Sequence, residues 1–119
     1  MKHEIMWWMS RLTIMLTSLF LSFSLAASAY ATEIQMGDDG NLVFEPNEVT
    51  VNAGETVTFV NNALPPHNII VDGRADLSRE ALMFSPGETQ EIVFADKGDF
   101  NFKCAPHEGA GMKGVIHVK

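Results

Sequence analysis

Three residues near the end of the sequence have side chains that can bind a metal ion. The stretch CAPHEGAGM contains the only cysteine of the chain, Cys104, followed by His107 and Met112. The small residues at 109–111 permit sharp curvature of the backbone. A loop that leaves one strand and returns into the next can therefore direct a thiolate, an imidazole and a thioether at one point.

A fourth donor has to come from elsewhere in the chain, and the stretch NNALPPHN supplies His67. Structural zinc sites use Cys and His, and thioether is not among the usual ligands of zinc. Two imidazoles, one thiolate and a weak axial thioether suit copper as Cu(I) and as Cu(II). Because the protein fills every position, no place is left for a substrate. The set predicts electron transfer rather than catalysis.

Other interpretations of the cysteine stay open. An inward-facing free cysteine is commonly an inert core residue. Cys104 and His107 could act as a nucleophile and its base, but no orienting acid or oxyanion group is evident nearby. A copper storage or delivery protein would favour more exposed Met and Cys donors.

The segments around these donors have the pattern of β-strands. Apolar residues alternate in EIQMG, ETVTFVNN, HNIIVD, ETQEIVF, GDFNFKC and GVIHVK, and Gly, Pro, Asn and Asp separate these segments. This pattern is typical of a β-sandwich or barrel. In GDFNFKC the period of two puts Phe102 and Cys104 on one face, so Cys104 points inward, whereas His117 points outward in GVIHVK. Only residues 76–84, DLSREALMF, predict a helix, of about two turns.

Residues 1–31 have the layout of a cleaved secretory signal peptide. Lys2 and Arg11 form a positive front, LTIMLTSLFLSFSLAA is the apolar run, and AYA at 29–31 is a cleavage-like site, with cleavage expected after Ala31. The alternative is a membrane anchor. A spanning helix needs about 20 predominantly apolar residues, and this run is shorter and interrupted by Ser and Thr. No other segment is apolar enough to span a membrane.

The remaining domain, residues 32–119, is small and acidic. It contains 14 acidic and 6 basic residues, a net charge of −8, and neither Trp nor Tyr. Nucleic acids and anionic membranes would repel such a protein, and basic partners would attract it. The composition therefore argues against nucleic acid as a partner.

The stretches CAPHEGAGM, NNALPPHN, GDDGNLVFEP and SPGE together resemble the plastocyanin family of small cupredoxins, across essentially all of 32–119. The resemblance implies an all-β Greek-key sandwich of about eight strands. It also implies a soluble monomer that carries one electron from cytochrome f to photosystem I and binds one copper ion. The implied ligands are His67, Cys104, His107 and Met112, with Asn68 linking the two ligand loops by hydrogen bonds.

The resemblance further implies a docking surface. His107 would be the point of electron entry and exit, surrounded by an apolar ring; ordinary loop packing is the alternative role for each residue of that ring. The ring residues are Gly40, Leu42, Leu64, Pro66, Leu82 and Ala110.

Three features depart from the family pattern. A tyrosine usually precedes the copper cysteine, and here the residue is Lys103. Glu108 follows the ligand histidine, where relatives often have arginine or glutamine. Basic residues also interrupt the acidic patches of plant members; the residues concerned are Asp72, Arg74, Arg79 and Glu80.

The leader and the loop bear on the type and location of the carrier. A single short leader favours a cyanobacterial type exported to the thylakoid lumen, or to the periplasm if the host has no thylakoids. A pseudoazurin-like or amicyanin-like periplasmic carrier is the alternative. Amicyanin loops are shorter between His and Met, and pseudoazurins usually add a C-terminal helical extension.

Overall fold

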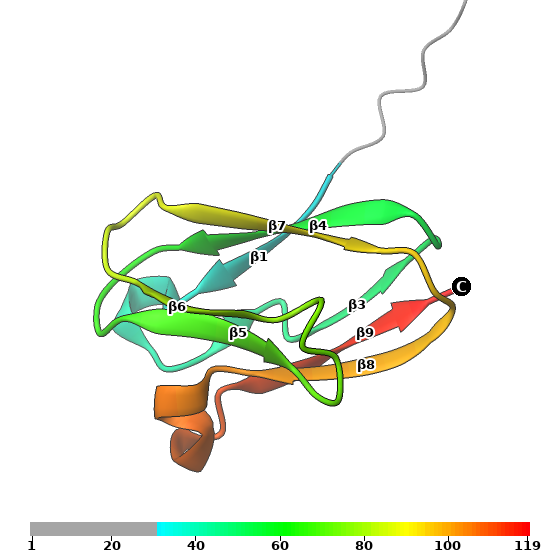
Figure 1. The fold of residues 1–119 in the computed structure, drawn as a ribbon. Coiled ribbons are helices and arrows are strands. Elements are labelled where there is room, and N and C mark those ends of the chain that lie inside the picture. Colours follow the sequence, from blue (N-terminus) through cyan, green and yellow to red (C-terminus); the bar gives the residue numbers. More distant parts are fainter. Residues whose placement is uncertain (1–30) are drawn as a thin grey trace, which may run out of the picture.

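Two β-sheets packed face to face form the protein (Figure 1). The computed structural model describes residues 31–119, so residues 1–30 of the predicted signal peptide lie outside the described residues. Cleavage after Ala31 stays a prediction. Within the described range, no helix has both the length and the apolar character needed to cross a membrane.

The first sheet has four strands in the order β2-β1-β4-β7. Its strands are β1 (Thr32–Met36), β2 (Phe44–Glu45), β4 (Glu55–Asn61) and β7 (Thr89–Phe94). The second sheet has five strands in the order β3-β9-β8-β5-β6. Its strands are β3 (Glu48–Val51), β5 (His67–Val71), β6 (Arg79–Met83), β8 (Gly98–Lys103) and β9 (Lys113–Val118). Two short 3-10 helices, η1 (Asp38–Gly40) and η2 (Ala105–Ala110), lie in loops.

The sheets are mixed. β1 runs parallel to β4, β3 runs parallel to β9, and the other pairs are antiparallel. The prediction of an all-β sandwich is confirmed, with nine strands in the described residues instead of about eight. One of the nine, β6, is not expected from the sequence.

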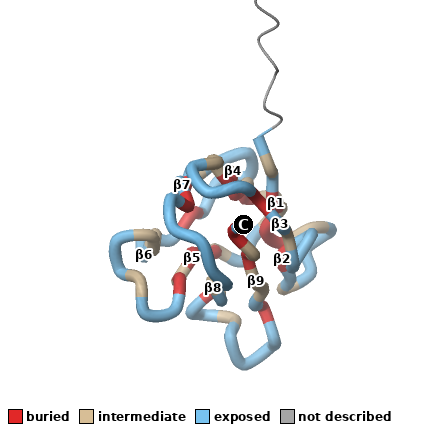
Figure 2. The backbone as a smooth tube through the Cα atoms, turned by 90° about the vertical axis from the view of Figure 1, so that its right-hand side faces the viewer, coloured by how far each residue is buried: buried red, intermediate tan, exposed pale blue. Residues whose placement is uncertain are grey.

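The core lies between the two sheets, and Figure 2 marks the buried residues along the strands that form it. The alternation seen in the sequence is observed in β1 and β4, whose inward residues are fully buried. The Phe102 ring packs edge to face against Phe44 at 4.7 Å and against Phe59 at 5.4 Å, measured between ring centroids. Edge-to-face aromatic pairs stabilise a fold beyond the contribution of buried apolar area. Phe102 therefore joins both sheets two residues before Cys104.

The predicted helix at 76–84 is wrong, because residues 79–83 form the edge strand β6. Leu, Arg, Glu, Ala and Met all favour helix locally. Pairing with β5 overrides that preference, with Met83 opposite His67, and Met83 is buried in the core. The turn before the strand is stabilised by Ser78, whose hydroxyl accepts a hydrogen bond from the Val71 N–H at 2.9 Å. Tertiary contacts, and not local helix propensity, therefore determine that residues 79–83 form a strand.

His117 points outward from β9, as predicted, and lies between two carboxylates. Its Nδ1 is 2.6 Å from Asp99 Oδ1 on β8, and its Nε2 is 2.7 Å from Glu48 Oε1 on β3. These contacts join three strands. Hydrogen bonding to Asp99 first, and to Glu48 second, raises the pKa of His117 above its usual 6.5.

We expect the contribution of His117 to stability to fall as pH rises. A raised pKa in the folded state means that the gain is complete below the unfolded-state pKa of 6.5 and is lost as pH rises through the folded pKa. Urea unfolding of the wild type and of His117→Gln, in the same copper state, should differ most near pH 5.5 and converge at high pH. A difference that is constant or grows with pH would contradict the ion-pair interpretation.

Candidate metal centre

The segments that carry the predicted metal-binding residues meet at one end of the sandwich, where β5 starts and β8 ends, on the left in Figure 1. His67 begins β5, and Cys104 directly follows the last residue of β8. β5 and β8 are antiparallel neighbours, with Ile70 opposite Lys103. The start of β5 and the end of β8 therefore lie at the same end of the sheet. His107 lies at that end too, in η2, which directly follows Cys104.

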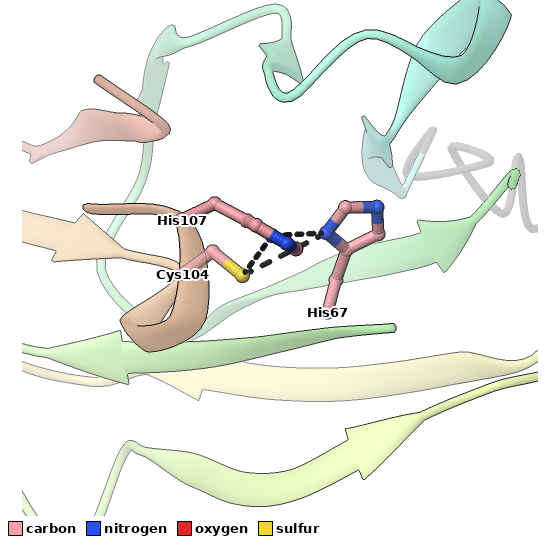
Figure 3. A group of neighbouring side chains, drawn as sticks. All are labelled: His67, Cys104 and His107. Carbon is pink, nitrogen blue, oxygen red and sulfur yellow. Dashed lines mark hydrogen bonds between the residues drawn. The ribbon is translucent and has the colours of Figure 1, made fainter. Parts of the chain in front are cut away.

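The side chains of His67, Cys104 and His107 point toward one another (Figure 3). Cys104 Sγ is 3.4 Å from His107 Nδ1 and 3.7 Å from His67 Nδ1, and the two Nδ1 atoms are 3.2 Å apart. All three donor atoms lie within 4.8 Å of one another. Two imidazoles and a thiolate in this arrangement fit a single ion between them.

Met112 returns the chain from the loop into β9. Its side chain is fully buried. The Cys104 N–H donates to the Met112 carbonyl at 3.0 Å, and the Met112 N–H donates to the His107 carbonyl at 3.3 Å. These bonds close the base of the loop. The structure thus places a buried thioether beside the ligand loop, as the spacing predicts.

Burial affects the protonation of the donors in opposite directions. It lowers the pKa of His67, and the nearby His107 lowers it further. Burial raises the pKa of the Cys104 thiol. His67 is therefore a neutral imidazole at pH 7, ready to donate a lone pair, whereas a metal must displace the thiol proton of Cys104.

Asn68 connects the two ligand segments directly. Its Oδ1 accepts a hydrogen bond from the Ala105 N–H at 2.8 Å, and its Nδ2 donates to the Glu80 carbonyl at 3.1 Å. Asn68 is almost fully buried, with 6% of its surface exposed. One side chain on β5 therefore contacts both the loop after β8 and the edge strand β6.

Gly37 packs against the Nε2 side of the His67 ring, and the Nδ1 side faces Cys104 and His107. This contact is not recognisable from the sequence alone. It has φ +75°, and a Cβ placed there would lie 2.5 Å from His67 Nε2 and 3.0 Å from the Ala63 carbonyl oxygen. His67 Nε2 is buried without a hydrogen bond of good geometry. The sequence indicates only a turn at 37–41, because no local pattern pairs a glycine with a histidine 30 positions away.

We expect Gly37→Ala to displace the His67 ring and to weaken copper binding. Gly40→Ala is the matched control, because Gly40 has φ +77° in the same loop and nothing lies within 4 Å of its added Cβ. Both variants should lose about 1–2 kcal/mol through left-handed backbone strain. Only Gly37→Ala should change the visible spectrum of the copper(II) protein. Equal spectra for the two variants would show that the ring tolerates the added methyl group.

The residues of the predicted docking ring are all at least partly exposed. Leu64 has 57% and Leu82 40% of its surface exposed. The loops that carry most of them flank the donor cluster: η1 with the two residues that follow it, the loop before β5, and η2. The ring residues in these loops are Gly40, Leu42, Leu64, Pro66 and Ala110.

A sandwich with two imidazoles and a thiolate converging at one end, beside a buried thioether, defines a small copper protein of the blue-copper type. A model of copper binding proteins, the plastocyanin/azurin family, matches residues 31–119. The chain therefore belongs to the plastocyanin/azurin family of copper binding proteins, and its cofactor is copper.

Individual relatives agree with this assignment. The chain is 45% identical over 106 residues to the chloroplastic plastocyanin of Physcomitrium patens, covering 82% of this chain and 63% of that one. It is 41% identical over 92 residues to the plastocyanin of Cucumis sativus, covering 69% and 93%. The match thus spans less than two thirds of the length of the chloroplastic relatives, 63–64%.

Solved structures show the same fold. The oxidized plastocyanin of Dryopteris crassirhizoma superposes with a TM-score of 0.67 at 31% identity, covering 74% of this chain and all of that one. The amicyanin of Paracoccus versutus superposes with a TM-score of 0.62 at 26% identity, covering 79% and 86%.

Proposed function

We propose that the protein is a soluble one-electron carrier and not an enzyme. The observation that carries this proposal is the convergence of His67, Cys104 and His107 at the end of a copper-family sandwich. Bound copper supplies a one-electron couple, Cu(I)/Cu(II). A donor set that suits both states needs little rearrangement when the charge changes.

We assign the metal ligands as His67 Nδ1, Cys104 Sγ, His107 Nδ1 and the Met112 thioether. His67, Cys104 and Met112 are fully buried and exclude water from the centre, whereas His107 is partly exposed. His107 is thus the ligand closest to a docked partner. The hydrogen bond from the Ala105 N–H to Asn68 keeps the loop carrying the cysteine against β5.

We assign cytochrome f as the electron donor and photosystem I as the electron acceptor. Three of the curated relatives are chloroplastic plastocyanins. A lumenal location after cleavage at Ala31 follows from the proposal. A small apolar surface around His107 favours transient contacts. The net charge of −8 for residues 32–119 adds attraction to basic partners. The protein would act as a monomer on the lumenal side of the membrane.

The test is electron donation to isolated photosystem I. Reduced, copper-loaded protein should accelerate re-reduction of the flash-oxidised reaction centre in proportion to its concentration. Leu64→Arg should slow this reaction, because it places a charge in the exposed apolar ring, and should leave the visible spectrum unchanged. A blue protein that does not react with photosystem I would contradict the assigned partners.

An amicyanin-like periplasmic carrier is the second candidate, supported by the structural likeness to amicyanin. It predicts the same spectrum but no donation to photosystem I. The flash experiment therefore separates the two functions.

A further inference from the structure

The ligand loop comprises residues 104–112, between β8 and β9. Two oppositely charged residues lie next to two of its assigned ligands. Lys103 is the last residue of β8 and precedes Cys104, and Glu108 lies in η2 and follows His107. Lys103 Nζ is 3.1 Å from Glu108 Oε1, and the two side chains are 29% and 50% exposed. The contact therefore spans from a rigid strand to the part of the loop that carries the exposed ligand.

That part of the loop has few other restraints. Backbone bonds close its base, and Asn68 holds Ala105. In the described part of the chain, the contact with Lys103 is the only side-chain hydrogen bond or ion pair made by residues 108–111. Residues 108–111 are all exposed.

Neighbouring charges influence the position of the Lys103 ammonium group. Lys113 lies opposite Lys103 on β9, where like charges repel. Asp72 Oδ1 is 3.9 Å from Lys103 Nζ on the other side. These residues and Glu108 line a surface hollow of about 310 Å³. Repulsion from Lys113 and attraction to the two carboxylates both favour the observed position of the ammonium group.

We propose that the ion pair between Lys103 and Glu108 is a tether that holds His107 against Cys104 and slows opening of the ligand loop. Both residues are positioning residues, and the proposal rests on the ligand assignment given above. A half-exposed ion pair contributes modestly. The effect is therefore expected on the rate at which the loop opens and releases copper, and not on whether the site forms.

The experiment measures release of copper(I) from the loaded protein to excess chelator. At low salt, Lys103→Met and Glu108→Gln should each increase the rate by about two- to fivefold. The double variant should be no faster than either single variant, because both remove the same interaction. Lys103→Arg should keep the wild-type rate. Lys113→Met is the matched comparison: it removes a positive charge from the same hollow but leaves both members of the ion pair, so it should increase the rate less than Lys103→Met does.

Salt dependence provides a second signature. Raising the ionic strength should speed release from the wild type toward the rate of the variants, because salt screens the ion pair. The three variants that lack the pair should not respond in this way.

The possible outcomes distinguish failure of the tether proposal from failure of the ligand assignment. Coloured variants with the wild-type release rate, or single-variant effects that add in the double variant, would overturn the tether. The same holds if Lys113→Met acts like Lys103→Met, since net charge would then explain the result. Failure of the wild type to bind copper and become blue would instead overturn the ligand assignment.

Discussion

Replacing Cys104 with serine should remove the intense absorption near the red end of the visible spectrum that we expect of the copper(II) protein. A thiolate is the only soft anionic donor in the assigned set, and blue-copper character depends on it. Serine is close in size to cysteine, so the fold should persist with a cost of about 1–3 kcal/mol for a buried hydroxyl. Copper bound by the histidines alone would be nearly colourless.

The measurement is a copper(II) titration followed by visible absorption, with circular dichroism to confirm folding. Because residues 32–119 contain neither Trp nor Tyr, the visible band of the wild-type domain should stand out against weak protein absorption. His117→Gln is the control, since His117 lies at the far end of β9 and should leave the band intact. A coloured Cys104→Ser protein would show that the thiolate is not a ligand.

Replacing Gly114 with alanine should destabilise the domain by about 3 kcal/mol. The added Cβ would lie 2.2 Å from the Asn47 carbonyl oxygen and 2.6 Å from Phe102 Cζ. Neither group can yield easily. The carbonyl accepts a hydrogen bond from the Val115 N–H at 2.9 Å, and Phe102 packs against two other rings. A domain of this size is typically stable by only about 5–10 kcal/mol.

Urea unfolding midpoints measure this loss. Gly109→Ala is the matched control, because Gly109 has no positive φ and its added Cβ meets nothing within 4 Å. We expect its midpoint to stay within error of the wild type. Similar midpoints for Gly114→Ala and the wild type would mean that β3 moves away from β9 at little cost.

The donor residues and most strands could be predicted because their signals are local. Period-two alternation indicates the inward direction of Phe102 and Cys104, and both are buried. The spacing of Cys104, His107 and Met112 within one loop is also visible in the sequence. Composition around a turn and the alternation along a strand are sufficient for these predictions.

The features that could not be predicted depend on contacts between distant segments. The segment that forms β6 has helical propensity and becomes a strand only through pairing with β5. The close approach of Gly37 to His67 requires two loops to meet. The ion pair between Lys103 and Glu108 requires η2 to turn back over β8. No local pattern specifies any of these three contacts.

Both ends of the described domain lie away from the donor cluster. β1 starts at Thr32 beside Val57 and runs toward the ligand loops, and the Lys119 carbonyl accepts a hydrogen bond from the Ala53 N–H at the opposite end of the sandwich (Figure 1). A linker attached at either end could thus anchor the molecule to an electrode with His107 facing solution. Immobilised in that orientation, the protein would present its redox face to a soluble partner and could serve as a sensor surface.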